Sequence, residues 1–354
     1  MFVFWLAVTG CDGGTVKLAD TGDTSAFGDT AADTDTDTDT DTDTDTDTDL
    51  ELTALTFVLE GDYDATGLNL LWLEEDFTAG ETLAGEGVTA ASVTVQVAAP
   101  DESELLPLEG YEGVYFRYAL PFVFLDDDGD LAHDNDEIVE GVGSVWPVYI
   151  TGDLPVEFGA MGIVDGWNAL DITSGGTPSP GSIDAIPLPV NLRADLTASV
   201  GGTLVGDAAS RTDLDLALIP SVAFEGGGIT SLLYNQGLAS PWTLGVSSAP
   251  PADHVVALDA AGIYGSFQVP MAYADTDANG IPGATELLWP ACSGADAALL
   301  FWIEPPTDPR IGYSLIQAEL PPGWHTVRAD PTEELVHLTE EEALALEIGG
   351  SCSL

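Results

Sequence analysis

One run of sequence occurs twice, as Gly113-Val114-Tyr115-Phe116-Arg117-Tyr118-Ala119-Leu120-Pro121 and, 149 residues later, as Gly262-Ile263-Tyr264-Gly265-Ser266-Phe267-Gln268-Val269-Pro270. The two runs align without a gap. Both are rich in aromatic and β-branched residues and are bounded by Gly and Pro, which is typical of β-strands. Because a repeat of this length is a whole domain rather than a solenoid unit, the pair predicts a tandem duplication.

Features beyond the two runs support the duplication. Each run leads into an acidic stretch, and a Trp-Pro and a Gly-Trp dipeptide follow in both halves, at Trp146-Pro147 and Trp289-Pro290 and at Gly166-Trp167 and Gly323-Trp324. Chance similarity in a chain of biased composition is the alternative. Duplication explains a gapless series of aromatic residues, Pro and acids better than chance does.

Short apolar runs with period two recur along the chain between clusters of Gly, Asp and Pro, and no long segment shows a helical period. This pattern is typical of antiparallel β-sandwiches. We therefore predict an all-β fold with two tandem, related β-sandwich (Ig-like) domains. The strands expected in the second domain are 192–200, 214–219, 242–246, 264–272, 298–303 and 313–319. Alternation of Leu344, Leu346 and Ile348 predicts a last strand, with a short helix capped by Thr339 and Glu342 as the alternative.

Composition shifts divide the chain into five parts. Residues 1–10 form a signal segment, and 11–50 a tether that begins with a lipidated Cys and is disordered because it is polar and carries charge of one sign. The first domain is expected at 51–172, a Gly/Ser/Pro linker at 173–182, and the second domain at 183–354. Fully extended, the tether would reach roughly 130 Å.

The acidic stretch in the second half fits a calcium-binding loop of twelve positions. Asp275, Asp277 and Asn279 stand at positions one, three and five, the carbonyl of Ile281 at position seven, and Glu286 at position twelve. Ca²⁺ prefers six to eight oxygen ligands, and a Gly at position six, here Gly280, allows the sharp turn. The alternative is an acidic surface turn without an ion.

The equivalent stretch in the first half follows the same spacing with one departure. Asp126, Asp128, Asp130 and Glu137 occupy positions one, three, five and twelve, with an added carboxylate from Asp134 at position nine. Leu131 stands where Gly is expected, so this turn requires a strained or altered backbone. His133 lies inside the loop and is interpreted as a solvated residue rather than a ligand.

The overall charge is strongly acidic. The 354 residues include 61 Asp and Glu but only 6 Lys and Arg, a formal net charge of −55. Such a chain repels nucleic acid and anionic membrane surfaces and attracts cations. Hydrophobic residues make up 45%, enough to build sizeable cores.

Cysteine usage points to an exported protein. The apolar segment before Val8-Thr9-Gly10-Cys11 is too short to span a bilayer, and it resembles the lipobox of bacterial lipoproteins, which implies lipidation of Cys11. We expect anchoring in the cell envelope, at the outer membrane or cell surface. Cys292 and Cys352 remain as a pair and predict a disulfide, with two buried thiols as the alternative.

Catalytic motifs are missing from the sequence. No zinc-type His or Cys cluster, nucleophile elbow, phosphate-binding loop or dinucleotide fingerprint occurs. We therefore expect a non-enzymatic surface protein with calcium-stabilised domains and a structural or binding role. The alternatives are a carbohydrate-active hydrolase with a carboxylate pair at the domain junction and an adhesion module with a protein or glycan ligand.

Two resemblances accompany these expectations. Signal segment, Cys11, Asp-Thr tether and β domains together resemble cell-surface lipoproteins of unknown function from myxobacteria and related groups. The run Asp275-Thr276-Asp277-Ala278-Asn279-Gly280-Ile281-Pro282 resembles the calcium loops of thrombospondin type 3 repeats and dockerins. The flanks here are expected to be strands rather than helices, which favours a structural ion over a calcium sensor.

Overall fold

The computed structural model describes residues 52–74, 79–171, 179–220, 234–235, 237–258, 262–279, 282–283, 286–329 and 335–352. The expected signal segment, Cys11 and the acidic tether lie outside the described residues, as do Gly280, Ile281 and residues 173–178 of the expected linker. The described elements are mainly strands, so the predicted all-β class is confirmed.

The first half of the chain forms two sheets, and we call it the first unit. The smaller sheet has the order β11-β1-β4 and the larger β10-β9-β8-β6-β2-β3, with β5 and β7 paired to β6. Its elements are β1 Leu52–Glu60, β2 Gly67–Leu73, β3 Ala79–Gly87, β4 Ser92–Ala98, η1 Glu102–Glu104, β5 Leu106–Pro107, β6 Val114–Phe124, β7 Val139–Val142, β8 Val145–Gly152, α1 Val156–Met161, β9 Gly166–Asp171, β10 Ser179–Gly181 and β11 Ile186–Pro189.

Two apolar clusters sandwich the larger sheet of the first unit. Alternation along β4 buries Val93, Val95 and Val97, which belong to a cluster between the two sheets. Strand β2 is buried along its whole length because its side chains alternate between this cluster and a second one, which includes Leu71 and Leu73. Helix α1 and neighbouring loops cover the second cluster on the outer face of the sheet.

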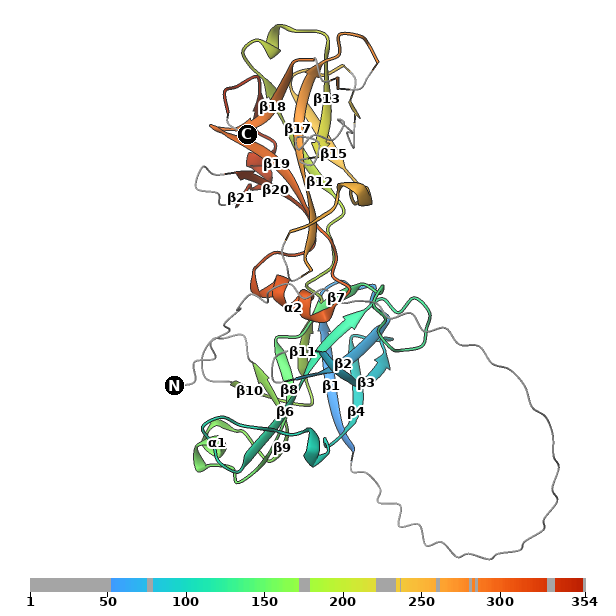
Figure 1. Ribbon diagram of the computed structural model, residues 1–354, viewed down its shortest axis with the longest axis vertical. Helices are drawn as coiled ribbons and strands as arrows, with labels where there is room; N and C mark the ends of the chain where they lie inside the picture. The colour runs from blue at the N-terminus through green and yellow to red at the C-terminus, as the bar shows by residue number, and fades with distance from the viewer. Residues whose placement is uncertain are drawn as a thin grey trace, which may run out of the picture.

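The second half forms a second unit, drawn above the first in Figure 1. Its strands join into one sheet system, because β18 pairs with β17, β19 and β22. The elements are β12 Ala198–Leu204, η2 Ala208–Ser210, β13 Leu214–Pro220, β14 Tyr234–Asn235, β15 Trp242–Val246, η4 Ala252–His254, β16 Val256–Ala257, β17 Tyr264–Ala274, β18 Leu288–Ser293, β19 Asp296–Ile303, α2 Pro309–Gln317, β20 Gly323–Ala329, β21 Leu335–His337, α3 Glu340–Ala343 and β22 Leu346–Ile348.

The two units share most of their strand pairings, although the pairs of β18 with β19 and β22 have no counterpart in the first unit. The series β22-β12-β15 repeats β11-β1-β4, and the pairings of β21, β20, β19, β17, β13 and β14 repeat those of β10, β9, β8, β6, β2 and β3. Even the unusual parallel pair is repeated, since β1 runs parallel to β11 and β12 parallel to β22. Helices α1 and α2 both connect the paired strands that precede and follow them.

The boundary between the two units lies further along the chain than the predicted linker. The expected linker at 173–182 contains β10, which pairs with β9, and the next strand, β11, pairs with β1. The pairings of the second unit begin with β12 at Ala198. A Pro- and Gly-rich run was read as a linker, but Pro is tolerated in a short edge strand such as β10.

Other local predictions need correction. Residues 313–319 were expected to be a strand but lie largely in helix α2. The side chain of Asp308 caps this helix by accepting a hydrogen bond from the backbone N–H of Arg310 at 2.8 Å, and Pro309 occupies the first turn. At the C-terminus both alternatives occur, since Thr339 and Glu342 form the capping box of α3 and β22 follows.

The Trp-Pro dipeptides are not equivalent, although they recur. Trp146 lies in β8 opposite Leu170, whereas Trp289 lies in β18 opposite Ala272. The Gly-Trp dipeptides are equivalent: Trp167 of β9 pairs with Tyr149 of β8, and Trp324 of β20 pairs with Trp302 of β19.

Helix α2 of the second unit packs on the β7 end of the first unit (Figure 1). The backbone N–H of Val139 donates to the carbonyl oxygen of Pro306 at 2.9 Å, and the rings of Trp146 and Tyr313 lie 5.1 Å apart. Gly312 faces Val142 and Leu192 with no room for a side chain. Apolar residues of both units therefore belong to one continuous cluster.

The expected disulfide joins Cys292 of β18 to Cys352, with the Cα atoms 5.9 Å apart. It fixes the chain after β22 to the edge of β18 in the second unit. The bond closes a loop of 60 residues, for which the chain-entropy model gives a stabilisation of about 4 kcal/mol.

A matched pair of Gly substitutions tests the junction between the units. A Cβ at position 312 would lie 2.6 Å from Leu192 Cδ1 and 3.1 Å from Val142 Cγ2, whereas a Cβ at position 159 of α1 would meet nothing within 4 Å. We expect Gly312→Ala to destabilise the protein by about 1–3 kcal/mol through overpacking. Gly159→Ala should stabilise it by up to about 1 kcal/mol through helix propensity.

Urea unfolding of both variants measures these free energies. Equal effects of the two substitutions would contradict the packing of α2 on the first unit.

Candidate metal sites

Each acidic loop gathers three carboxylates. In the first loop, Asp126, Asp128 and Asp130 each offer an oxygen, and these oxygens lie within 4.8 Å of one another. In the second loop, the same holds for Asp275, Asp277 and Glu286. Both loops begin where the long central strand of a unit ends, β6 in one and β17 in the other.

The backbone of the first loop wraps around the carboxylate of Asp126. Its oxygens accept hydrogen bonds from the N–H groups of Gly129 at 2.7 Å and Leu131 at 3.1 Å. Both residues adopt a left-handed conformation, with φ of 79° and 65°. The departure from Gly at position six is therefore accommodated by a Leu in a conformation that costs roughly 1–2 kcal/mol.

A buried Asn holds the first loop in this conformation. Asn69 of β2 is fully buried, and its Nδ2 donates to the carbonyl oxygen of Leu131 at 3.0 Å. The backbone of Asp126 is also held next to the start of β2, because its N–H donates a hydrogen bond to Oγ1 of Thr66, the residue before that strand, at 2.9 Å. The strained turn is thus anchored to the sheet beneath it.

The final Glu closes both loops in the same way. Glu137 accepts from the N–H groups of Asp127 at 2.9 Å and Asp134 at 2.8 Å, one on each carboxylate oxygen. Glu286 accepts from the N–H groups of Thr276 at 2.7 Å and Gly283 at 2.8 Å. These donors stand at equivalent positions of the two loops.

Not every predicted ligand joins a carboxylate group. Asn279 is held beside Asp277, to which its Nδ2 donates at 2.8 Å. Glu137 and Asp134 are outside the group of three in the first loop, although Asp134 supplies an N–H to Glu137. Ile281 lies outside the described residues.

His133 is not the solvated residue that the sequence suggested. Its ring is half-buried and meets the rings of Phe122 and Phe124 edge-on, with centroids 5.1 Å apart in each case. Its Nε2 lies 3.2 Å from the carbonyl oxygen of Glu137. The side chain packs the first loop onto the outer face of the sheet.

No Arg forms an ion pair with a loop carboxylate among the described residues. Each of the five Arg is instead paired with an acid elsewhere: Arg117 with Glu74, Arg193 with Asp64, Arg211 with Asp213, Arg310 with Asp308, and Arg328 with Asp296. Three carboxylates within 4.8 Å of one another repel in each loop, so an external cation would be favoured there.

The remaining His pair belongs to the packing of the second unit. The rings of His325 and His337 meet edge-on at 5.2 Å, and His325 Nε2 lies 2.7 Å from the carbonyl oxygen of Pro321. Burial lowers the pKa of His325, and the nearby His337 lowers it further. Among the described residues, neither His belongs to a group of side chains that could hold a metal ion.

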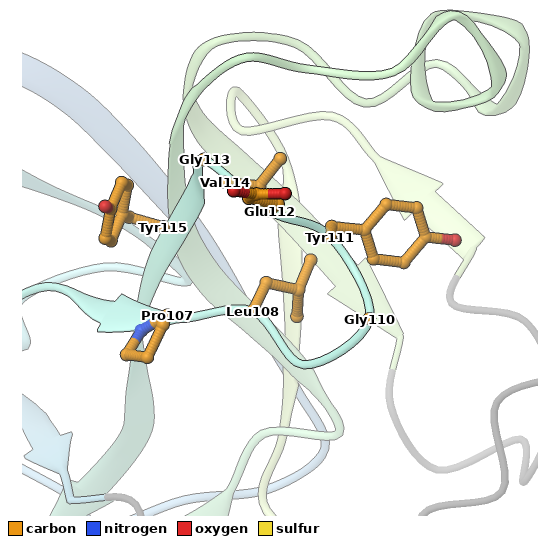
Figure 2. A pocket seen from close by; sticks show the side chains of 8 residues that line it. All are labelled: Pro107, Leu108, Gly110, Tyr111, Glu112, Gly113, Val114 and Tyr115. Carbon is orange, nitrogen blue, oxygen red and sulfur yellow. The ribbon is translucent and has the colours of Figure 1, made fainter.

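A shallow hollow lies on the turn between β5 and β6 (Figure 2). Tyr111 and Tyr115 stand on opposite sides of this turn, with Leu108 and Glu112 between them. Glu112 is the single carboxylate among the lining residues. The hollow therefore does not supply the acid pair that a glycosidase uses.

Comparisons with known proteins found no match to a family model, a curated protein or a solved structure. Within the described parts of the chain, no helix is long and apolar enough to span a membrane.

Replacing Asn69 tests how the first loop is held. Asn69→Leu removes the hydrogen bond to Leu131 while keeping the side-chain volume similar, so amide exchange at Gly129 and Leu131 should accelerate. Hydrogen exchange read by NMR measures this, and the Asn279 amide in the second loop is the internal control. Unchanged exchange at Leu131 would show that Asn69 does not hold the turn.

Proposed function

We propose that this chain is a non-enzymatic protein of the cell envelope whose β units are stabilised by calcium, with a structural or binding role. The observation that carries the proposal is the pair of equivalent loops, each of which brings three carboxylate oxygens within 4.8 Å of one another.

Calcium suits these loops better than a transition metal does. The side chains that meet there offer oxygen and no thiolate or imidazole ligand, since His133 is turned toward Phe122 and Phe124. Hard divalent cations prefer such ligands, and Ca²⁺ tolerates the irregular geometry of a loop better than Mg²⁺. Glu286 adds the two-oxygen carboxylate at position twelve that completes a calcium loop.

Calcium in the first loop would also act on the junction between the units. Glu137 closes that loop, and two residues later the N–H of Val139 donates to Pro306 of the second unit. Val142, at the end of the same short strand, packs against Gly312. An ion that fixes the loop therefore fixes the edge on which α2 docks, and it stiffens the pair of units into one body.

The N-terminal region completes the proposal. A lipid on Cys11 would anchor the chain, and the Asp-Thr tether would hold the folded units away from the membrane. We further propose that the two units arose by tandem duplication, which is supported by the repeated pairings and by the equivalent hydrogen bonds of Glu137 and Glu286.

Thermal unfolding with and without calcium tests the metal. Chelation should lower the melting temperature and added Ca²⁺ should restore it, because the ion binds the folded loops and relieves their repulsion. The double variant Asp275→Asn with Glu286→Gln should remove one of two binding events in calorimetry.

The matched control is Asp62→Asn with Glu102→Gln, which removes two exposed acids outside both loops. This control should bind calcium like the wild type. If chelation leaves the melting temperature of the wild type unchanged and calorimetry detects no binding, the calcium proposal is wrong.

A local readout tests whether the first loop supports the junction. In calcium, the Val139 amide should exchange slowly because it donates to Pro306, and the double variant Asp126→Asn with Asp128→Asn should exchange it faster. Hydrogen exchange of the second-loop variant provides the comparison. Equal Val139 exchange in all three proteins would contradict a link between the first loop and the junction.

A further inference from the structure

The junction between the two units joins a different surface of each unit. In the second unit, the end formed by the β19–α2–β20 segment is covered by the first unit. Pro306, Pro309 and Gly312 are buried there, and Tyr313 meets Trp146. The surface that receives this end is the edge formed by β7 and the residues after β11, including Val142 and Leu192.

The equivalent end of the first unit, at β8–α1–β9, is uncovered. Phe158-Gly159 in α1 aligns with Ile311-Gly312 in α2, so Val156 stands where Pro309 is buried. The side chain of Val156 is 89% exposed, and Val164 just after the helix is 57% exposed. A Cβ on Gly159 would meet nothing within 4 Å. Among the residues that the structure describes, none packs on this end as Val142 and Leu192 pack on Gly312.

The equivalent of the receiving edge is exposed in part, because β22 and β19 pair with Ala291–Ser293 of β18 while β17 is the partner of the residues before them. Met271 pairs with Pro290 as Phe122 pairs with Val142, so β18 in the second unit corresponds to β7 in the first. Leu287, directly after the second acidic loop, is 59% exposed. Leu288, Trp289 and Pro290 are half-buried, so the edge presents a run of apolar side chains.

We propose that the α1 end of one molecule docks on the β18 edge of a second copy of this chain, in the manner in which α2 docks on β7. Figure 1 shows α1 and β18 at opposite ends of the molecule. Such a contact joins two different surfaces, so it does not close into a symmetric dimer and instead adds molecules head to tail.

The two new surfaces differ from the internal pair at one matched position. Position 160 of α1 is Ala where α2 has Tyr313, and β18 has Trp289 where β7 has Gly141. Trp289 packs against the core of its own unit, with Arg211 5.6 Å from its ring centroid, so Leu287 is the apolar side chain that this edge offers to a partner. The disulfide to Cys352 holds that edge in place, since Cys292 lies in β18.

Charge sets the conditions under which the contact forms. A net charge of −55 opposes association of two copies. In about 1 M salt the Debye length falls to about 3 Å, and the repulsion between molecules is largely screened. Association should therefore strengthen with salt, as expected for an apolar contact between like-charged molecules.

Sedimentation velocity of the full chain in about 1 M NaCl tests the proposal. Cys11→Ser is introduced throughout so that neither a lipid nor an intermolecular disulfide imitates the contact. The wild-type surfaces should give species that grow with concentration beyond a dimer. Val156→Glu with Val164→Glu, at the α1 end, should give monomers, and so should Leu287→Glu at the β18 edge.

Mixing the two blocked chains is the decisive step. One retains a working α1 end and the other a working β18 edge, so an equimolar mixture should form one-to-one dimers and nothing larger. Leu335→Glu, at an apolar site on β21 that is 42% exposed, is the control and should assemble like the wild type. Matching melting temperatures confirm that all variants fold.

Three results would overturn the proposal. The wild-type surfaces would remain monomeric at every concentration, the Leu287→Glu chain would still assemble, or the mixture of blocked chains would yield only monomers. Assembly that survives Leu287→Glu but not the α1 substitutions would instead indicate symmetric pairing of α1 ends.

Discussion

Each unit is built on a sheet with two apolar faces, and neither face can remain in water. Strands β2 and β13 are buried along their whole lengths. The three-stranded group covers one face, so the connections between strands must cover the other. Helix α1 and the first acidic loop do this in the first unit, where Phe158 and His133 pack on the sheet.

This constraint explains why the acidic loops are tightly folded. A loop that covers an apolar face cannot extend into solvent to separate its charges. The first loop is pinned at Thr66 and Asn69, and its Asp carboxylates are held together at the same time. Burial of one side of the loop thus favours the compact conformation, and repulsion between its carboxylates opposes it. A divalent cation bound to the carboxylates would reduce this repulsion without changing the packing.

The same constraint explains the position of α2. In the second unit the outer face is divided between a small cluster around Met271 and Tyr273 and the larger cluster that continues into the first unit. Helix α2 covers the part of that face nearest the first unit. Its other side, at Gly312, contacts Val142 and Leu192. The junction is therefore an extension of sheet packing rather than a separate interface.

Local pattern predicted many of the strands and both loops, but it failed for the expected strands 192–200 and 313–319 and for the long-range pairing. Alternation in Val93, Val95 and Val97 fixes a face of β4, and the Asp spacing places the carboxylates of each loop together. The parallel pairing of β11 with β1 joins segments more than a hundred residues apart, and nothing in the run near Ile186 encodes its partner. The apolar alternation around Tyr313 outweighed the Asp308-Pro309 helix start, which was the signal available for α2.

The two loops show which features the geometry requires. Between their first and last acids the residues differ at most positions, yet the Glu at position twelve accepts from N–H groups at positions two and nine in both. The closure and the carboxylates at positions one and three are thus common to both loops, while most of the residues between them differ. Under the proposed function, these shared groups are the ones that would place oxygens around a cation. The closing Glu stands just before β7 in the first unit and just before β18 in the second, and β7 is the strand on which α2 packs.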